Sequence, residues 1–134
     1  MSADTSPSPA EAWLAIRATD SPDLWRVAFQ EHHLGNPLIR SVHGGVVGAL
    51  MEHAAIRSLE YALAEKGLGA RVGVVTTAID YMRVTKDADL FARARIERIA
   101  RRVAFLSVHC WQDGEDMPVA RCNSTLRIVE DSAA

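Results

Sequence analysis

The chain changes its hydrophobic pattern twice. Over residues 24–30, apolar and polar side chains alternate, with large apolar residues at every second position, and this alternation predicts a strand. The segment 46–66 is instead rich in Ala and Leu and stops just before Gly67. Residues of that kind favour a helix, and glycine commonly follows the end of one, so we predict one long helix here.

Beyond this helix the two-residue period returns and persists almost to the end of the chain. Val, Ile, Thr and aromatic residues concentrate in four long segments, at residues 70–82, 88–99, 102–112 and 117–129. Short connections with turn-forming residues separate them, so neighbouring segments should pair as antiparallel strands. One long apolar helix beside one antiparallel sheet predicts an α+β domain in which the sheet curls around the helix.

The segments ahead of the long helix are shorter. Residues 1–9 are rich in Ser and Pro and poor in apolar groups, which predicts a disordered tail. A short helix that includes Ile16 should follow and end before Pro22, and residues 31–42 are expected to form a loop. A single domain would then cover residues 10–131.

The composition limits the classes of partner. With 134 residues, a net charge of −2 and an isoelectric point near 6.2, the chain has the size of one domain. That charge gives no global attraction for nucleic acid or for an anionic membrane. No stretch approaches the roughly 18 apolar residues that span a bilayer, and the start lacks the basic and apolar regions of a secretion signal. We therefore expect a cytoplasmic protein that binds neither nucleic acid nor membrane.

Glu52 interrupts the apolar stripe of the predicted long helix. At about 100° per residue, five small or apolar residues lie within roughly 60° of it on the helical wheel. They are Gly45, Ala49, Ile56, Leu59 and Leu63. An unpaired carboxylate is costly to bury, so such a side chain is either neutralised by a neighbour or held in place for use. The alternative is a glutamate that reaches solvent at a seam between subunits or pairs with an arginine.

His43, Gly44 and Gly45 stand at the start of the same helix. Two glycines let the backbone approach a ligand closely, and the first turn of a helix carries unpaired N–H groups at the positive end of its dipole. An oxyanion that develops on a thioester carbonyl would be stabilised there. Taken alone, these residues are better explained as a glycine-rich loop that turns into the helix.

The rise of the helix separates these two features. Glu52 follows Gly45 by seven residues and lies near the same azimuth, so about 10 Å of helix axis lies between them at 1.5 Å per residue. This distance is too long for both groups to act on one carbonyl carbon. If both act on one substrate, a second subunit has to supply one of them, which predicts a dimeric site.

The whole order of motifs resembles the PaaI-type family of hotdog acyl-CoA thioesterases, named for phenylacetate degradation. The likeness begins with Asn36 upstream of the segment His43-Gly44-Gly45, and with Glu52 nine residues after the histidine. It continues in the later strands and their turns, at residues 79–83, 90–96, 100–104 and 113–120.

The resemblance covers roughly residues 24–129 and implies several general properties. It implies a hotdog fold, in which a curled antiparallel sheet wraps a long central helix, and hydrolysis of an acyl-CoA to free acid and CoA. It also implies homodimers that commonly pair into homotetramers. Neither a metal nor a cofactor is expected.

The resemblance further implies roles for individual residues. The backbone N–H of Gly44 or Gly45 would polarise the thioester carbonyl. Glu52 of the partner subunit would attack that carbonyl or activate a water to do so. Asn36 would hold the water or the substrate, and His43 would shape the loop beside the thioester.

Two departures from the family pattern affect the lining of the pocket. Family members often carry Ser or Thr at the position of Val74, and Thr76 and Thr77 are the nearby hydroxyl groups that could contact substrate instead. Residues 39–42 lack the glycine that usually precedes the histidine. Both departures leave the carboxylate in place.

Five arginines form the one basic concentration of the chain. In a regular strand Arg93 and Arg95 share a face, and Arg98 takes the other. Arg101 and Arg102, at the predicted turn, are the better candidates for contact with the phosphates of CoA, because guanidinium groups suit phosphate oxygens. The alternative is a solvated hairpin with charged edges.

Acyl-CoA hydrolysis is therefore the predicted function, with two alternatives. A hotdog protein that binds acyl-CoA without hydrolysis, or a less active partner subunit, would explain Val74 and the altered loop. Hydration of an enoyl thioester would need a catalytic histidine in Pro-Gly surroundings, which His43 lacks. No His, Cys or carboxylate spacing suggests a zinc site.

Overall fold

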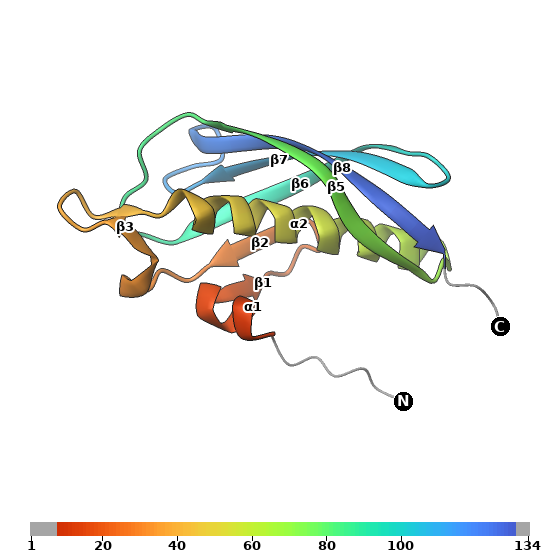
Figure 1. Ribbon diagram of the computed structural model, residues 1–134, viewed down its shortest axis with the longest axis horizontal. Coiled ribbons are helices and arrows are strands. Elements are labelled where there is room, and N and C mark those ends of the chain that lie inside the picture. Colours follow the sequence, from red (N-terminus) through yellow and green to blue (C-terminus); the bar gives the residue numbers. More distant parts are fainter. Residues whose placement is uncertain (1–7, 131–134) are drawn as a thin grey trace.

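In the computed structural model, which describes residues 8–130, one long helix packs against a strongly curled antiparallel sheet (Figure 1). The helix, α2 (Gly44–Glu65), contacts five of the strands. This arrangement confirms the predicted α+β class and the curled sheet. Residues 1–7 of the predicted tail lie outside the described residues, and Pro9 already belongs to a helix.

Six antiparallel strands form the main sheet. In spatial order they are β1 (Ile16–Ala18), β2 (Leu24–Val27), β6 (Leu90–Ile99), β7 (Val103–Trp111), β8 (Pro118–Glu130) and β5 (Ala70–Tyr81). The four long strands expected from the two-residue period are all present. The last three lie side by side because short turns join β6 to β7 and β7 to β8.

The core lies between α2 and the inner face of the sheet. The helix buries its apolar stripe there, comprising Val46, Val47, Leu50, Met51, Ala54, Ala55, Leu59 and Leu63. Facing strands contribute fully buried residues such as Leu90, Leu106 and Leu126. The helix ends where Gly67 adopts a left-handed φ of 73° and Leu68 N donates to Leu63 O at 3.0 Å, a glycine stop of the predicted kind. In the described part of the chain, no helix is long and apolar enough to cross a membrane.

The N-terminal helix is shorter than the sequence pattern predicts. Helix α1 (Pro9–Leu14) is capped by the Ser8 hydroxyl and ends at Ala15, whose φ is 56°. The expected inclusion of Ile16 is wrong, because Ile16 begins β1 and pairs with Val27. Tertiary pairing of this short strand outweighs the weak helical pattern of the sequence.

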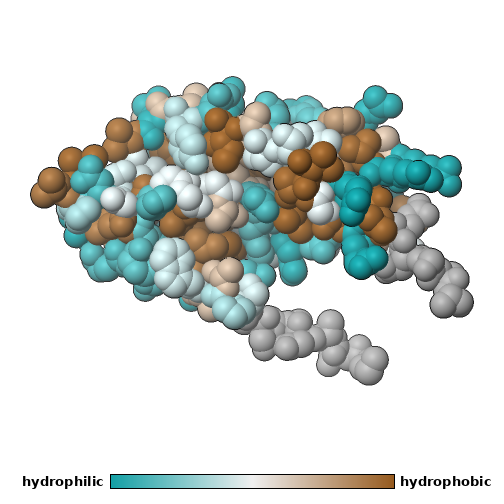
Figure 2. Space-filling view, viewed as in Figure 1, coloured by the Kyte–Doolittle hydropathy of each residue, from teal (hydrophilic) through white to brown (hydrophobic). Residues whose placement is uncertain are grey.

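The predicted strand over residues 24–30 also ends early, at Val27, and the predicted loop over residues 31–42 contains regular structure. A 3-10 turn, η1 (Glu31–His33), leads into a small hairpin of β3 (Leu34–Asn36) and β4 (Ser41–Val42). Figure 2 shows apolar side chains gathered at this end of the molecule. Leu38, at the tip of this hairpin, is 94% exposed.

The expected placement of Arg98 is wrong. The register of β6 against β7 shifts between Ile96 and Arg98, so that Arg98 pairs with Phe105 on the outer face of the sheet. Arg93 and Arg95 pair with outward residues of β7 as well. An extra residue in a strand moves every following side chain to the opposite face, so the three arginines share one face.

Leu50→Ala should lower the free energy of unfolding by about 2–5 kcal/mol, because Leu50 has no exposed surface and its loss leaves a cavity under α2. Urea denaturation measures this value. Leu38→Ala is the matched control, and at its exposed position the same substitution should change stability by no more than about 0.5 kcal/mol. Equal effects at the two leucines would contradict the placement of the core.

Candidate functional site

The first turn of α2 carries one capped and one open backbone N–H group. His43 is the N-cap, and its Nδ1 accepts a hydrogen bond from Gly45 N at 2.9 Å. The carbonyl oxygen of His43 accepts from Val46 N at 2.9 Å. Within residues 8–130 the Gly44 N–H has no hydrogen-bond partner. Of the two candidate glycines, Gly44 therefore presents the free donor, at the positive end of the helix dipole.

Contacts from three directions hold this turn in place. The Tyr81 hydroxyl at the end of β5 donates to Gly44 O at 2.9 Å. On the other side, a Cβ at Gly35 would lie 2.9 Å from the His43 Cα, so only glycine lets β3 pack this closely against the cap. Just ahead of the helix, the buried Thr85 hydroxyl accepts from Val42 N at 2.9 Å and donates to Val42 O at 3.1 Å.

Glu52 lies on the exposed side of α2 in the single chain. The prediction that it sits within a continuous buried stripe is wrong for one subunit. Only the later part of that stripe is buried, at Leu59 and Leu63, whereas Gly45 is exposed and Ile56 is half-buried. On this side of α2, burial therefore increases toward the second half of the helix. The outcome matches the alternative of a glutamate that reaches solvent.

The packing of α2 against β5 shows what lies beside Glu52. A Cβ at Gly48 would lie 3.3 Å from the Ile79 side chain, and Gly44 stands next to Tyr81. One turn of α2 therefore covers about the same length as two residues of β5, and the strand runs in the opposite direction to the helix. By this register Glu52 lies level with Thr77. Glu52 is also close enough to Cys122 on β8 that its charge adds to the effect of burial in raising the pKa of that thiol.

The structure separates the two candidate hydroxyl groups. Thr77 is half-buried on the inner face and lies 3.1 Å from the hydroxyl of Ser124, which is buried. Thr76 pairs with Thr125 on the outer face and is exposed, because the register of β5 shifts after Val74. Sequence reasoning missed Ser124, whose position opposite Thr77 depends on the strand register. Thr77 and Ser124 are therefore the hydroxyl groups nearest the level of Glu52.

Asn36 lies at the end of β3, where it pairs with Ser41 in the hairpin. Its side chain is exposed, and its Oδ1 accepts from Leu38 N at 3.2 Å within the turn. No contact joins it to Gly44 or to Glu52 in the described residues. These residues also contain no group of three or more His, Cys, Asp or Glu side chains that could hold a metal ion.

Strand β5, which lies beside Glu52, forms an open edge of the main sheet. Among the described strands it pairs only with β8, so its other edge presents free backbone N–H and C=O groups. Val75 and Tyr81 on this strand are more than half exposed, at 61% and 57%. A strand edge of this length is a ready template for pairing with another chain.

The predicted phosphate-binding arginines lie at the far end of the sheet from the glycines. Arg101 and Arg102 are exposed at the turn between β6 and β7, and with Arg127 they line a cavity of about 330 Å³, which we call the arginine cavity. Arg127 escaped sequence reasoning because it lies on β8, far along the chain. Cross-strand pairing of Arg127 with Val103 brings it beside the turn.

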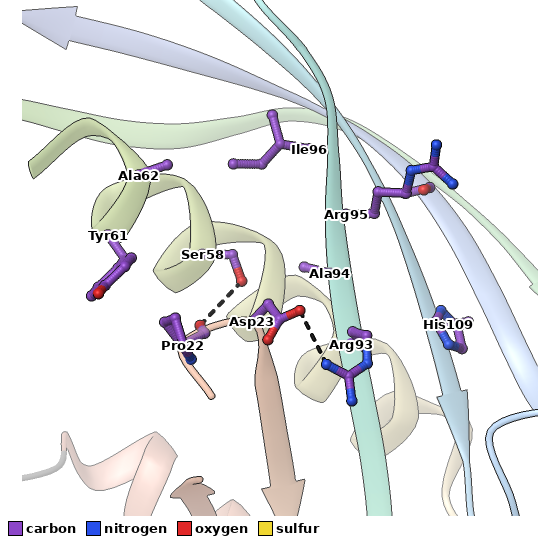
Figure 3. Close-up of a pocket in the computed structure, with 11 residues that line it drawn as sticks. Pro22, Asp23, Ser58, Tyr61, Ala62, Arg93, Ala94, Arg95, Ile96 and His109 are labelled. Carbon is purple, nitrogen blue, oxygen red and sulfur yellow. Dashed lines mark hydrogen bonds and ion pairs between the residues drawn. The ribbon is translucent and has the colours of Figure 1, made fainter. Parts of the chain in front are cut away.

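A larger cavity, of about 620 Å³, is lined by Arg93 and Arg95 but by none of the predicted catalytic residues. It opens beside the start of β2, where β6 continues past Arg93 without a neighbour on that side. Figure 3 shows Ser58, Tyr61 and Ala62 on α2 facing Ala94 and Ile96 on β6 across this space. It therefore lies along the second half of the helix, away from the open N–H group.

Helix, sheet and the glycine turn together define a hotdog domain. The sequence matches the thioesterase superfamily over residues 40–119, which is more than half of the chain. The chain therefore belongs to the thioesterase superfamily, and thioester hydrolysis is its indicated general activity.

Solved structures share this fold. A phenylacetic acid degradation-related protein of Ralstonia eutropha is 26% identical, with a TM-score of 0.74 over 92% of this chain and 93% of that one. A thioesterase of Haemophilus influenzae is 18% identical, with a TM-score of 0.78 over 93% and 87% of the two chains. A Bacillus halodurans protein solved with CoA is 18% identical, with a TM-score of 0.79 over 92% and 78%. The last two establish the fold alone. Among curated proteins, none matches this chain in sequence.

Thr85→Val should destabilise the protein by about 1–3 kcal/mol, because the methyl group would leave the buried N–H and C=O of Val42 without their partner. Thr85→Ser is the matched control, since it keeps the hydroxyl and should retain most of the stability. Thermal unfolding of both variants measures the difference. If valine and serine behaved alike, the hydroxyl would not be what holds the chain ahead of His43.

Proposed function

We propose that this protein hydrolyses acyl-CoA thioesters to free acid and CoA at a site shared by two subunits. The observation that carries the proposal is the open Gly44 N–H at the start of α2, with Glu52 on the exposed side of the same helix, two turns further along. Strand β5, which packs against this helix, has a free edge. Thioester hydrolysis requires two groups: a hydrogen-bond donor that stabilises the oxyanion, and a carboxylate that attacks or activates water.

The chemistry follows from these two groups. The Glu52 carboxylate would add to the thioester carbonyl directly, or take a proton from a water that adds. The carbonyl π electrons then move onto oxygen, where the Gly44 N–H stabilises the negative charge. Collapse re-forms the carbonyl and breaks the C–S bond, and CoA leaves as a thiolate that takes up a proton. In the direct route, water then hydrolyses the resulting anhydride and restores Glu52.

Two subunits are needed because the groups are too far apart in one. Gly44 and Glu52 are eight residues apart, which is about 12 Å along the axis at 1.5 Å per residue. Antiparallel pairing of two β5 edges would bring a second helix alongside. A twofold axis near Ile79 would set Thr77 of the partner subunit opposite Tyr81, and so bring Glu52 of the partner subunit level with Gly44.

Gly44→Pro should lower kcat for acyl-CoA hydrolysis by about 10²–10³-fold, because proline removes the one N–H proposed to bind the oxyanion. Proline is suited to the first position of a helix, and the extended conformation of His43, with φ −58° and ψ 133°, is compatible with a following proline. Gly44→Ala is the control. Its Cβ would meet Tyr81 at an ordinary 3.5 Å, and its N–H is retained, so its activity should be near that of the wild type.

The shared site makes a second prediction for mixed dimers. Glu52→Gln should also abolish release of CoA, measured with a thiol reagent. Mixing this variant with Gly44→Pro should restore roughly a quarter of the wild-type activity, because half of the randomly mixed dimers would hold one intact site. No recovery after subunit exchange would mean that both groups act within one chain.

Coenzyme A phosphates are proposed to bind at the arginine cavity. The same β5 pairing would carry Gly73 of the partner subunit beyond Tyr81, where β5 ends, and Gly73 pairs with Arg127 across the sheet. The partner's arginine cavity would then lie beyond the glycine turn, on the side where the leaving CoA extends. Guanidinium groups suit phosphate oxygens because they form paired, charge-assisted hydrogen bonds.

Arg127→Ala should raise KM for acyl-CoA about tenfold, because a hydrogen bond to a charged group contributes about 1.5–3 kcal/mol, and leave kcat unchanged. The effect should shrink when the substrate lacks the ribose 3′-phosphate. Arg95→Ala is the control, since Arg95 is 78% exposed on the same face of the sheet and lies outside the cavity. A rise in KM for Arg95→Ala but not for Arg127→Ala would place the phosphates elsewhere.

A hotdog protein that binds acyl-CoA without hydrolysis is the second candidate. The observation that favours it is Val74, which is half-buried on β5 and supplies no hydroxyl at the position where family members often have one. The inward Thr77 hydroxyl, paired with Ser124, favours the enzyme instead. Thermal stabilisation by acyl-CoA with no release of CoA would support the binder.

A further inference from the structure

A small recess lies beside the glycine turn, on the side away from β5. It has a volume of about 240 Å³, and we call it the α1 recess because the N-terminal helix forms one wall. The residues that line it and matter here are Trp13, Leu14, Leu34, Val46, His43 and Gly45. Four of them are apolar, and His43 and Gly45 belong to the proposed catalytic turn.

Helix α1 is held against this turn through the backbone of Trp13. The Nε2 atoms of His32 and His33 lie 2.6 and 3.2 Å from the Trp13 carbonyl oxygen. His33 Nδ1 accepts from Gln30 N, so its Nε2 carries the proton and donates to that carbonyl. The indole ring also packs on the His32 ring, with centroids 4.5 Å apart. These contacts fix the backbone that carries the indole at the edge of the recess.

The indole itself stays accessible. Trp13 is 51% exposed, and the α1 recess that it lines contains no carboxylate, lysine or arginine. The α1 recess is therefore suited to an uncharged, apolar group. A benzene molecule occupies an apolar cavity of roughly 150 Å³, so the recess has room for one aromatic ring or a short aliphatic chain.

The larger cavity cannot serve the same group. Its helical residue Tyr61 lies seventeen residues after Gly44, which is about 25 Å along the axis at 1.5 Å per residue. A thioester whose carbonyl lies at Gly44 would not reach it with a short acyl group. The α1 recess, in contrast, begins at Gly45, the next residue.

We propose that the α1 recess binds the acyl group and that Trp13 limits its length, so that the substrates are thioesters of short aliphatic or single-ring acids. This inference rests on the proposed acyl-CoA hydrolysis. Trp13 is a specificity residue here and takes no part in bond breaking. Its removal should widen the range of acyl groups that are hydrolysed.

The test compares Trp13→Ala and Trp13→Phe with the wild type. The substrates are acetyl-, butanoyl-, benzoyl-, octanoyl- and decanoyl-CoA, and the measured quantity is kcat/KM for each. Trp13→Ala should raise the ratio of decanoyl to butanoyl hydrolysis by about tenfold or more, the usual effect of added room in an apolar pocket. Trp13→Phe should give an intermediate shift.

Tyr61→Ala is the matched control. Tyr61 is an aromatic residue of nearly equal exposure, 50%, that lines the larger cavity instead. Its substitution should leave the chain-length profile unchanged. A profile that moves with Tyr61→Ala, or with none of the variants, would overturn the assignment of the recess while leaving the proposed hydrolysis intact.

A second readout separates this inference from the proposed function. If the wild type hydrolyses none of the esters, the proposed function fails, and calorimetry with S-butyl-CoA and S-decyl-CoA still reports on the recess. Preferential gain of affinity for the decyl thioether in Trp13→Ala supports the acyl subsite, and unchanged affinities overturn it. Circular dichroism confirms that each variant is folded, and Trp13→Phe gives the same comparison if the alanine variant is not.

Discussion

The contact between the first turn of α2 and the end of β5 determines the geometry of everything else. Gly44 and Gly48 face Tyr81 and Ile79 without a Cβ, so the helix lies close to the strand. At Gly48 a side chain would meet Ile79 at 3.3 Å, and one of the two would have to move. The Tyr81 hydroxyl then ties the turn to the strand through Gly44 O. This packing places the glycine turn beside the end of β5, the strand with the free edge.

A single chain leaves these groups exposed to water. Electrostatic stabilisation of an oxyanion is much stronger where water is excluded, so a solvated amide and a solvated carboxylate form an incomplete site. The open half of α2 and the unpaired edge of β5 offer a surface that a second copy would cover. Pairing of the strands would thus supply both the missing group and the desolvation. The proposal of a site shared by two subunits follows from the helix rise and from this exposure.

The two ends of the molecule are proposed to serve different parts of the substrate. The glycine turn and the α1 recess lie at the start of α2, where the acyl group would bind. The arginine cavity lies at the other end of the sheet. Antiparallel pairing of two chains would bring one end of each subunit next to the opposite end of its partner. A long ligand with an apolar head and an anionic tail fits such a pair.

The amino-acid sequence alone determined the long helix, the four long strands and the α+β class, because hydrophobic period and glycine stops are local properties. It also placed His43, Gly44 and Glu52 in order along one helix. The tertiary structure decided which amide is free, since the His43 side chain takes the N–H of Gly45. It also decided that Thr77 faces inward and Arg98 outward, because the shifts in strand register that set these faces depend on pairing between distant segments. Contacts between distant segments, such as those between Trp13 and His32, produce no periodic pattern in the amino-acid sequence.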